Sequence, residues 1–340
     1  MTDRVYVIAE AGVNHNGSLE IAADLVRAAK LAGADAVKFQ AFRADALASP
    51  TAPKAAYQER ETGSADSQLE MLRALEFGES QHAAMIALGR EIGIDVLSSA
   101  FDLESLAMLA GLGLTMFKVP SGEITNLPYL RAVAAASAAT GGGRVFLSTG
   151  MADMDEVEAA VAALEAAGLS RAALTLLHCS TEYPAPVQDV NLRAMIALRL
   201  CFGATVGYSD HTEGTAVAAA AVALGACVIE KHLTLDRTMV GPDHKASLEP
   251  DAFAEMVAAI RDVEAALGDG VKRPTRVELE NRAIVRKSIV AARAIAAGEA
   301  FSEGNITTKR PGTGISPMRW DEVLGVAAPR DFAVDEEVEL

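Results

Sequence analysis

Short apolar segments alternate with longer helix-like segments along the first 270 residues of the chain. In the helix-like segments, apolar residues recur with the spacing of one helix face. From Leu25 to Ala32, for example, they occupy positions i, i+3, i+4 and i+7. Strands separated by helices of this length cannot pair as hairpins, so consecutive strands should run parallel. The strand-like segments fall at residues 5–9, 36–39, 95–98, 115–118, 144–148, 173–178, 203–208 and 227–231. Eight such units predict an α/β fold, a (β/α)8 TIM barrel, with a doubly wound sheet as the competing architecture.

A different pattern begins near residue 268. Gly and Pro residues interrupt the alternation between Gly268 and Pro274, which is typical of a linker. Farther on, short strand-like pieces such as 288–292 and 306–309 lie between Gly and Pro turns. We therefore predict a barrel over residues 1–270, a linker over 271–283 and a small, mostly β domain over 284–340. A domain of that size is marginal by itself, so we expect it to dock on its own barrel or on a partner's.

Residues 40–66 form a longer polar excursion after the second predicted strand. The segment contains Pro50, Pro53, Gly63 and several charges. An insertion that follows a barrel strand lies over the mouth of the barrel, so we expect a loop that covers a substrate.

The amino-acid composition argues against several classes of function. Apolar residues make up 51% of the chain, which is enough for a large core, and the net charge of −16 argues against a nucleic-acid groove or an anionic membrane surface. No apolar run is long enough to cross a bilayer, and the N-terminus shows no cleavable signal. The cysteines Cys179, Cys201 and Cys227 are few and far apart, so they predict reduced thiols in a cytoplasmic protein.

Polar side chains gather at the carboxyl ends of six strand-like segments. In a closed parallel barrel these ends meet at one mouth, which is where barrel enzymes place their active sites. The pattern therefore predicts an enzyme. The polar clusters begin at Glu10, at Lys38 and Gln40, at Lys118, at Ser148, at Gly207 and at Glu230.

Two histidines follow neighbouring strands, the seventh and the eighth. His211 and His232 could share a divalent metal ion and leave other coordination positions to substrate and water. The alternative is that each is a hydrogen-bonded barrel histidine. Imidazoles alone do not specify zinc, and manganese or magnesium fits equally well.

Two lysines and three serines at strand ends could bind an anion. The ammonium groups of Lys38 and Lys118, with hydroxyl and backbone donors nearby, suit a phosphate or a carboxylate. The alternative is a set of structural Lys–Glu pairs. No P-loop or GxGxxG motif is present, so nucleotide chemistry has no support. The serines are Ser121, Ser148 and Ser209, and the possible carboxylate partners are Glu10, Glu123 and Glu230.

The remaining candidates are less specific. Glu10 and Glu123 could orient hydroxyls or move protons if they are partly desolvated, and Tyr183 could touch a substrate. Cys179 has only the adjacent His178 as a possible base, so we interpret it as a buried thiol. His15 can simply shape the turn after the first strand.

The motifs at the strand ends resemble those of the sialic acid synthase family, bacterial type. The likeness covers nearly the whole chain, in order. The segment 309–317 also resembles the antifreeze-like (SAF) domain that ends these enzymes. The resembling barrel motifs are Glu10–Gly17, Val37–Gln40, Lys118–Glu123, Leu147–Met151, His178–Pro184, Gly207–Thr212, Ile229–His232 and Gly241–Ser247.

The resemblance implies a synthase that condenses phosphoenolpyruvate with an open-chain N-acylated mannosamine. It implies Mn²⁺, or Mg²⁺ or Co²⁺ in its place, on His211 and His232, and Glu123 between the two substrates. In some members an Asn that contacts phosphoenolpyruvate stands at the position of Thr181. This chain departs from the family pattern there. The implied phosphoenolpyruvate site is Lys38, Lys118, Ser121, Ser148 and Ser209, and the implied sugar contacts are Glu10, Gln40, Tyr183 and Asp243.

The resemblance also implies a domain-swapped homodimer in which Arg310 reaches the sugar's N-acyl group in the partner's barrel. From these features we predict an N-acetylneuraminate synthase that binds small molecules and neither nucleic acid nor membrane. The alternative is a legionaminate synthase using 2,4-diacetamido-2,4,6-trideoxymannose. Two further hypotheses are a phosphoenolpyruvate aldol synthase for a phosphorylated aldose, and a non-catalytic protein whose tail captures a partner.

Overall fold

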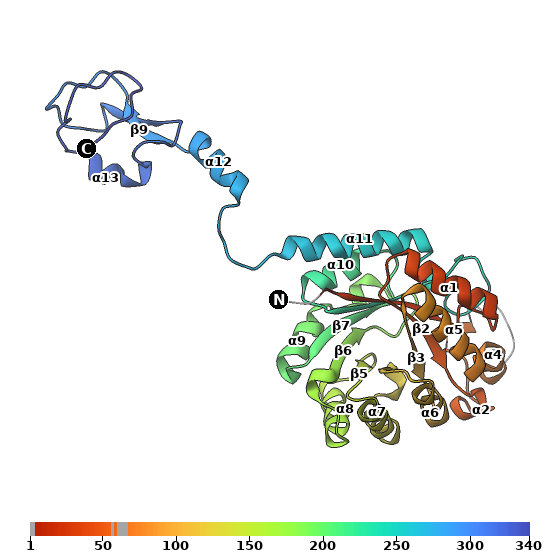
Figure 1. Ribbon diagram of the computed structural model, residues 1–340. Coiled ribbons are helices and arrows are strands. Elements are labelled where there is room, and N and C mark those ends of the chain that lie inside the picture. Colours follow the sequence, from red (N-terminus) through yellow and green to blue (C-terminus); the bar gives the residue numbers. More distant parts are fainter. Residues whose placement is uncertain (1–3, 56–57, 60–66) are drawn as a thin grey trace. The chain divides into compact units, whose positions relative to one another are not determined.

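Eight parallel strands close into a barrel in the computed structural model, which describes residues 4–55, 58–59 and 67–340 (Figure 1). Each strand pairs with the next along the chain, and β8 pairs with β1 to close the sheet. The predicted (β/α)8 barrel is therefore confirmed. The strands are β1 (Tyr6–Gly12), β2 (Ala36–Ala41), β3 (Asp95–Ala100), β4 (Met116–Val119), β5 (Arg144–Ser148), β6 (Leu174–Cys179), β7 (Thr205–Asp210) and β8 (Val228–His232).

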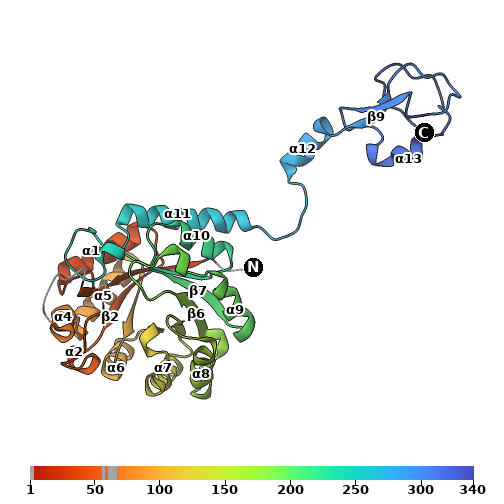
Figure 2. The same cartoon turned by 180° about the vertical axis from the view of Figure 1, so that it is seen from behind.

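Helices surround the barrel, as both views show (Figures 1 and 2). Side chains on the outer strand face pack against them and form the main hydrophobic core, because alternate residues of a strand point to opposite faces. The helices next to the strands are α1 (Leu19–Leu31), α5 (Glu79–Ile92), α6 (Leu103–Gly111), α7 (Leu127–Ala139), α8 (Met154–Ala166), α9 (Arg193–Phe202), α10 (Ala216–Ala223) and α11 (Pro250–Leu267).

The interior of the barrel is filled by a smaller set of apolar side chains. Ile8, Leu97, Phe146, Leu177 and Val228 are buried there, in a cluster separate from the core between strands and helices. This apolar plug lies beneath the polar residues that follow on the same strands. It explains why the chemistry is confined to one end of the barrel.

Among the described residues, the short helix α2 (Ala44–Leu47) lies within the segment predicted to cover a substrate. The helix α4 (Gln68–Leu75) begins just after that segment. A capping box at Ser67 and Glu70 fixes the start of α4, since each residue satisfies a backbone N–H of the other. Residues 56–57 and 60–66 of the predicted loop lie outside the described residues.

The chain divides into two compact units, Met1–Asp269 and Gly270–Leu340. The second unit holds the antiparallel pair β9 (Ser288–Ala291) and β10 (Ile306–Lys309), and its own small core includes Phe301 and Phe332. The short helix α13 (Trp320–Val323) packs into this unit. The segment predicted as a linker instead contains a helix, α12 (Arg276–Val285), which a capping box at Thr275 and Glu278 begins.

None of the helices among the described residues is both long enough and apolar enough to span a membrane.

Candidate active site

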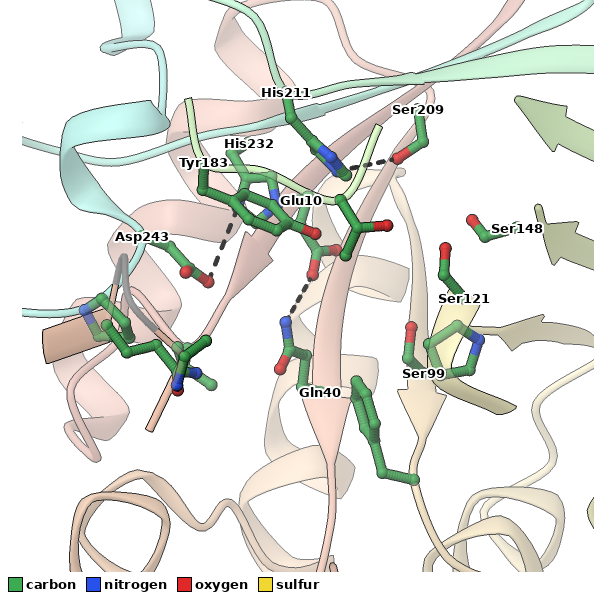
Figure 3. Close-up of a pocket in the computed structure, with 18 of the residues that line it drawn as sticks. Glu10, Gln40, Ser99, Ser121, Ser148, Tyr183, Ser209, His211, His232 and Asp243 are labelled. Atoms are coloured by element: carbon green, nitrogen blue, oxygen red, sulfur yellow. Dashed lines mark hydrogen bonds and ion pairs between the residues drawn. The ribbon is translucent and has the colours of Figure 1, made fainter. Parts of the chain in front are cut away.

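A cavity of about 570 Å³ opens at the carboxyl ends of the barrel strands (Figure 3). The structure brings almost all of the predicted site residues into its lining; Glu123 and Arg310 are the exceptions. The predicted residues that line it are Glu10, Lys38, Gln40, Lys118, Ser121, Ser148, Thr181, Tyr183, Ser209, His211, His232 and Asp243.

Strand register explains why these side chains converge. Glu10 on β1 lies opposite Lys38 on one side and His232 on the other, and Ser209 lies opposite Glu230. Neighbouring residues in register point to the same face of a sheet, so all of these side chains point into the barrel. Residues distant in sequence therefore become direct neighbours.

Lys38 is buried and surrounded by carboxylates. Its Nζ lies 2.6 Å from Oε2 of Glu10 and 3.7 Å from Oε2 of Glu230, and it donates to the hydroxyl of Ser99 at 2.9 Å. Ser99 was not predicted as a site residue. The third strand was predicted to end at residue 98, whereas β3 continues to Ala100, so its polar end went unrecognised.

Lys118 is also buried and bonds to the same glutamate. Its Nζ donates to Oε1 and Oε2 of Glu230 at 3.0 and 3.2 Å, and the Ser209 hydroxyl donates to Oε1 at 2.8 Å. The sequence suggested Glu230 only as a possible charge partner, whereas the structure places it at the centre of the cation cluster. Lys–Glu pairing and a cavity lined by both lysines thus coexist.

The charged groups in this cluster shift one another's pKa values. Burial opposes ionisation of Glu230, but the ammonium groups of Lys118 and Lys38 hold its pKa well below the usual value. Burial raises the pKa of Glu10, although Lys38 acts in the opposite direction. The two carboxylates raise the pKa of Lys38 despite its burial. Lys38 therefore stays cationic, and Glu10 is the carboxylate of this cluster best suited to take up a proton.

The two predicted metal ligands lie side by side, with ring centroids 5.5 Å apart. His211 donates from Nδ1 to the carbonyl oxygen of Ser180 at 2.6 Å, so Nε2 carries the lone pair. Inside the cavity, Nε2 lies 3.3 Å from the Ser209 hydroxyl (Figure 3). The Nδ1 atom of His232 is buried and has no hydrogen-bond partner. Burial lowers the pKa of both imidazoles, to about 4 for His211, so both are neutral at physiological pH.

These features fit a divalent ion, because neutral imidazoles with an oriented N–H and an unpartnered buried nitrogen are what a metal requires. Within the described ranges, no group of three or more His, Cys, Asp or Glu side chains could hold a metal. The protein would therefore supply two imidazoles and leave the other positions to substrate and water.

Polar residues next to the histidines extend the site toward β2. The carboxylate of Asp243 lies 3.9 Å from Nδ1 of His232, and Gln40 donates to Oε1 of Glu10 at 3.2 Å (Figure 3). The Tyr183 ring packs 4.2 Å from the His211 ring, measured between centroids. Burial, together with the charge of Glu10, raises the pKa of Asp243 to about 7.

Hydroxyl groups cover the opposite side of the cavity. The Ser121 Oγ accepts from the backbone N–H of Gly150 at 3.2 Å and lies 3.3 Å from the Cys179 sulfur. The Thr181 hydroxyl is buried without a partner. Ser148 also lines the cavity and lies near Ser121 in Figure 3. Cys179 is buried, as expected for a packed thiol.

Two predicted residues are not among those that line the cavity. Glu123 ends the short 3-10 helix Ser121–Glu123, outside the cavity lining, and its carboxylate accepts from the Asn126 amide at 2.6 Å. Arg310 is exposed and belongs to the second unit. The catalytic role of Glu123 and the sugar contact of Arg310 stay predictions.

Comparison with known proteins agrees with this geometry. The profile of the NeuB family matches residues 25–272, and that of the SAF domain matches residues 286–336. The chain is 51% identical over 333 residues to the N,N'-diacetyllegionaminic acid synthase of Campylobacter jejuni, with 98% of each protein covered. It is 46% identical over 323 residues to the enzyme of that name from Legionella pneumophila, covering 94% of this chain and 89% of the relative.

A solved structure gives the same assignment at the level of fold. The N-acetylneuraminic acid synthetase of Leptospira borgpetersenii, in complex with citrate, superposes with a TM-score of 0.71. It shares 32% sequence identity, over 82% of this chain and 90% of that one. A barrel with this set of strand-end residues, followed by a SAF domain, places the chain in the NeuB family of sialic acid-type synthases, which are phosphoenolpyruvate-dependent enzymes.

Proposed function

We propose that the protein is an N,N'-diacetyllegionaminic acid synthase, which condenses phosphoenolpyruvate with 2,4-diacetamido-2,4,6-trideoxymannose. The observation that carries this proposal is the identity of 51% and 46% to two synthases of that name, at nearly full length. The N-acetylneuraminate synthase expected first from the sequence is supported only at the family level, by a structure at 32% identity. The alternative prediction is therefore the better supported one.

In the proposed reaction, phosphoenolpyruvate lies on the side of the cavity that holds Lys38, Lys118 and the serines. Its phosphate and carboxylate would accept from the ammonium groups and hydroxyls, as anions do at clustered donors. The carboxylates of Glu10 and Glu230 already hold both lysines in place, so little reorganisation is needed when the substrate binds.

The aldehyde end of the open-chain sugar lies next to the two imidazoles. A divalent ion on His211 and His232, Mn²⁺ in this proposal, would supply Lewis-acid polarisation of the aldehyde oxygen. Asp243 and Gln40 are positioned to bind hydroxyl or amide groups farther along the sugar. Tyr183 packs beside the imidazoles and restricts the access of water to them.

Carbon–carbon bond formation joins C3 of phosphoenolpyruvate to the aldehyde carbon and leaves positive character at C2. Water then adds to C2, and phosphate leaves by C–O cleavage to give the 2-keto acid. Glu123 was the first candidate to take the proton from this water, with Glu10 second. The cavity favours Glu10, which lines it and whose pKa is raised by burial.

The proposal also includes a cytoplasmic homodimer with exchanged tails, in which Arg310 approaches the sugar of the partner subunit. Size-exclusion chromatography with light scattering would test the dimer. A monomer that is fully active would contradict this part alone.

The direct test of the reaction is to incubate the protein with phosphoenolpyruvate, Mn²⁺ and the diacetamido sugar. Phosphate release and a stoichiometric 2-keto acid are expected, at a higher kcat/KM than with N-acetylmannosamine. If neither sugar is consumed, the proposed function is wrong.

A further inference from the structure

One wall of the active-site cavity is mostly apolar, with the polar side chain of Gln68 at one end. On α4, the residues Gln68, Met71, Leu72 and Leu75 line the cavity, and they fall at i, i+3, i+4 and i+7, the spacing of a single helix face. Glu70, on the same helix, is exposed. An amphipathic helix normally buries its apolar face in the core, but here that face borders the cavity.

Side chains from the barrel complete this wall. Val13, just beyond β1, and Phe42, just beyond β2, are buried against Leu75, with Phe101 packing edge-on to Phe42 at 6.3 Å between ring centroids. This cluster is separate from the main barrel core and from the plug inside the barrel. We call Val13, Phe42, Met71, Leu72, Leu75 and Phe101 the apolar wall.

Part of the apolar wall follows directly after polar site residues. Glu10 on β1 precedes Val13, and Gln40 on β2 precedes Phe42, so the lining changes from polar to apolar just beyond the ends of these strands. Met71 and Leu72 are only partly buried, which leaves apolar surface facing the cavity. The cavity therefore has a charged floor and an apolar side.

A linear substrate bound in this cavity has a fixed direction. Its aldehyde must lie at the floor, beside the imidazoles and the lysines, so its far end extends toward the mouth. N-Acetylmannosamine carries hydroxyl groups at C4 and C6. The diacetamido-trideoxy sugar carries an acetamido group at C4 and a methyl group at C6, and both present methyl groups that an apolar surface can bury.

We propose that the apolar wall is the subsite that selects a sugar whose far end is deoxygenated and N-acetylated. This inference rests on the proposed function and adds the residues that determine specificity. A hydroxyl placed against Met71, Leu72 or Phe101 loses its water without gaining a partner, whereas a methyl group gains apolar contact. Discrimination by such a difference typically amounts to 10- to 200-fold in kcat/KM.

The experiment compares kcat/KM for the two sugars at saturating phosphoenolpyruvate and Mn²⁺. Met71→Gln and Leu72→Gln introduce a polar group of similar length, and Leu200→Gln on α9 is the matched control, because Leu200 is 77% exposed and outside the cavity. The preference of the unmodified protein for the diacetamido sugar should fall at least 10-fold in each wall variant and stay unchanged in the control. The KM for phosphoenolpyruvate should remain within about twofold throughout.

A measurement on the unmodified protein avoids any effect of the substitutions on folding. N-Acetyl-6-deoxymannosamine differs from N-acetylmannosamine by one hydroxyl, and it should be turned over with a kcat/KM roughly 10-fold higher. Equal rates for these two sugars, or wall variants that retain the full preference, would overturn the inference while leaving the synthase reaction intact. If the unmodified protein consumed none of the sugars, the proposed function itself would fail.

Discussion

Two buried Lys–carboxylate pairs lie on opposite faces of the barrel wall. On the inner face, Lys118 bonds to Glu230; on the outer face, Lys231 bonds to Asp210 at 2.9 Å. The side chains of both pairs are at most 5% exposed. Glu230 and Lys231 are consecutive residues of β8, so their side chains point to opposite faces of the sheet. The two ion pairs therefore lie in different environments.

The two pairs differ in what surrounds them. Lys118 and Glu230 line the cavity, where a substrate can replace or extend their contacts. Lys231 also donates to the carbonyl oxygen of Thr212, and Oδ1 of Asp210 accepts from the N–H and the hydroxyl of Thr212. The outer pair is thus satisfied entirely within the protein. The comparison teaches that only the pair that borders the cavity is placed to meet a substrate, although both pairs are buried.

The largest effect should follow from breaking the inner pair. Lys118→Met removes a cation that we propose binds phosphoenolpyruvate, and it leaves Glu230 to repel that substrate. We expect kcat/KM for phosphoenolpyruvate to fall roughly 10⁴-fold, about 5 kcal/mol, with little change in far-UV circular dichroism. A variant with near-normal kinetics would assign this pair to stability alone.

Breaking the outer pair should affect stability more than catalysis. Lys231→Met leaves the buried carboxylate of Asp210 without its counter-ion, which should lower the free energy of unfolding by about 4 kcal/mol in urea titrations. Adding Asp210→Asn, which keeps an acceptor for Thr212, should recover most of that loss. If Lys231→Met folded but showed the kinetic defect of Lys118→Met, the proposal that the two pairs have different roles would be wrong.

A buried ionisable group without a charged partner extends the comparison. His15 is fully buried, its Nδ1 accepts from the Gly17 N–H at 2.9 Å, and burial with the neighbouring His82 lowers its pKa to about 4. Since an unfolded histidine has a pKa near 6.5, the unfolded chain binds more protons between these values. The free energy of unfolding should therefore decrease by about 3 kcal/mol as the pH falls from about 6.5 to 4.

The measurement is urea unfolding followed by far-UV circular dichroism at several pH values. Tryptophan fluorescence would not serve, because the single tryptophan, Trp320, belongs to the second unit. His15→Gln should show a shallower decrease below pH 6.5. An identical pH dependence in both proteins would mean that His15 does not contribute.

The smallest effect concerns a cation that is exposed rather than buried. Arg310→Ala should raise the KM for the sugar about 30-fold, about 2 kcal/mol for a lost charged hydrogen bond, and leave the KM for phosphoenolpyruvate unchanged. Lys309→Ala, at the neighbouring exposed position, is the matched control. If Arg310→Ala left the sugar kinetics unchanged, the prediction that the tail contributes to the active site would be wrong.

Much of the barrel could be predicted because the spacing of apolar residues within each segment indicates whether it forms a strand or a helix. The strand-end rule then selected Lys38, Lys118, His211 and His232 without knowledge of any contact. Ser99 was missed because the end of its strand was placed two residues early. The helix α12 was missed because Gly and Pro around residues 268–274 were taken as a continuing linker, although Thr275 and Glu278 form a capping signal.

The sequence by itself predicted the barrel, the side of the barrel that carries polar residues and the residue types available there, because the period within each strand and helix is a local property and the units can be counted along the chain. Only the tertiary structure decided which charges pair, that Glu230 joins both lysines, that Glu123 lies outside the cavity and that α4 turns its apolar face toward it. These depend on register between strands and on packing between segments far apart in the chain. Local periodicity does not encode either of them.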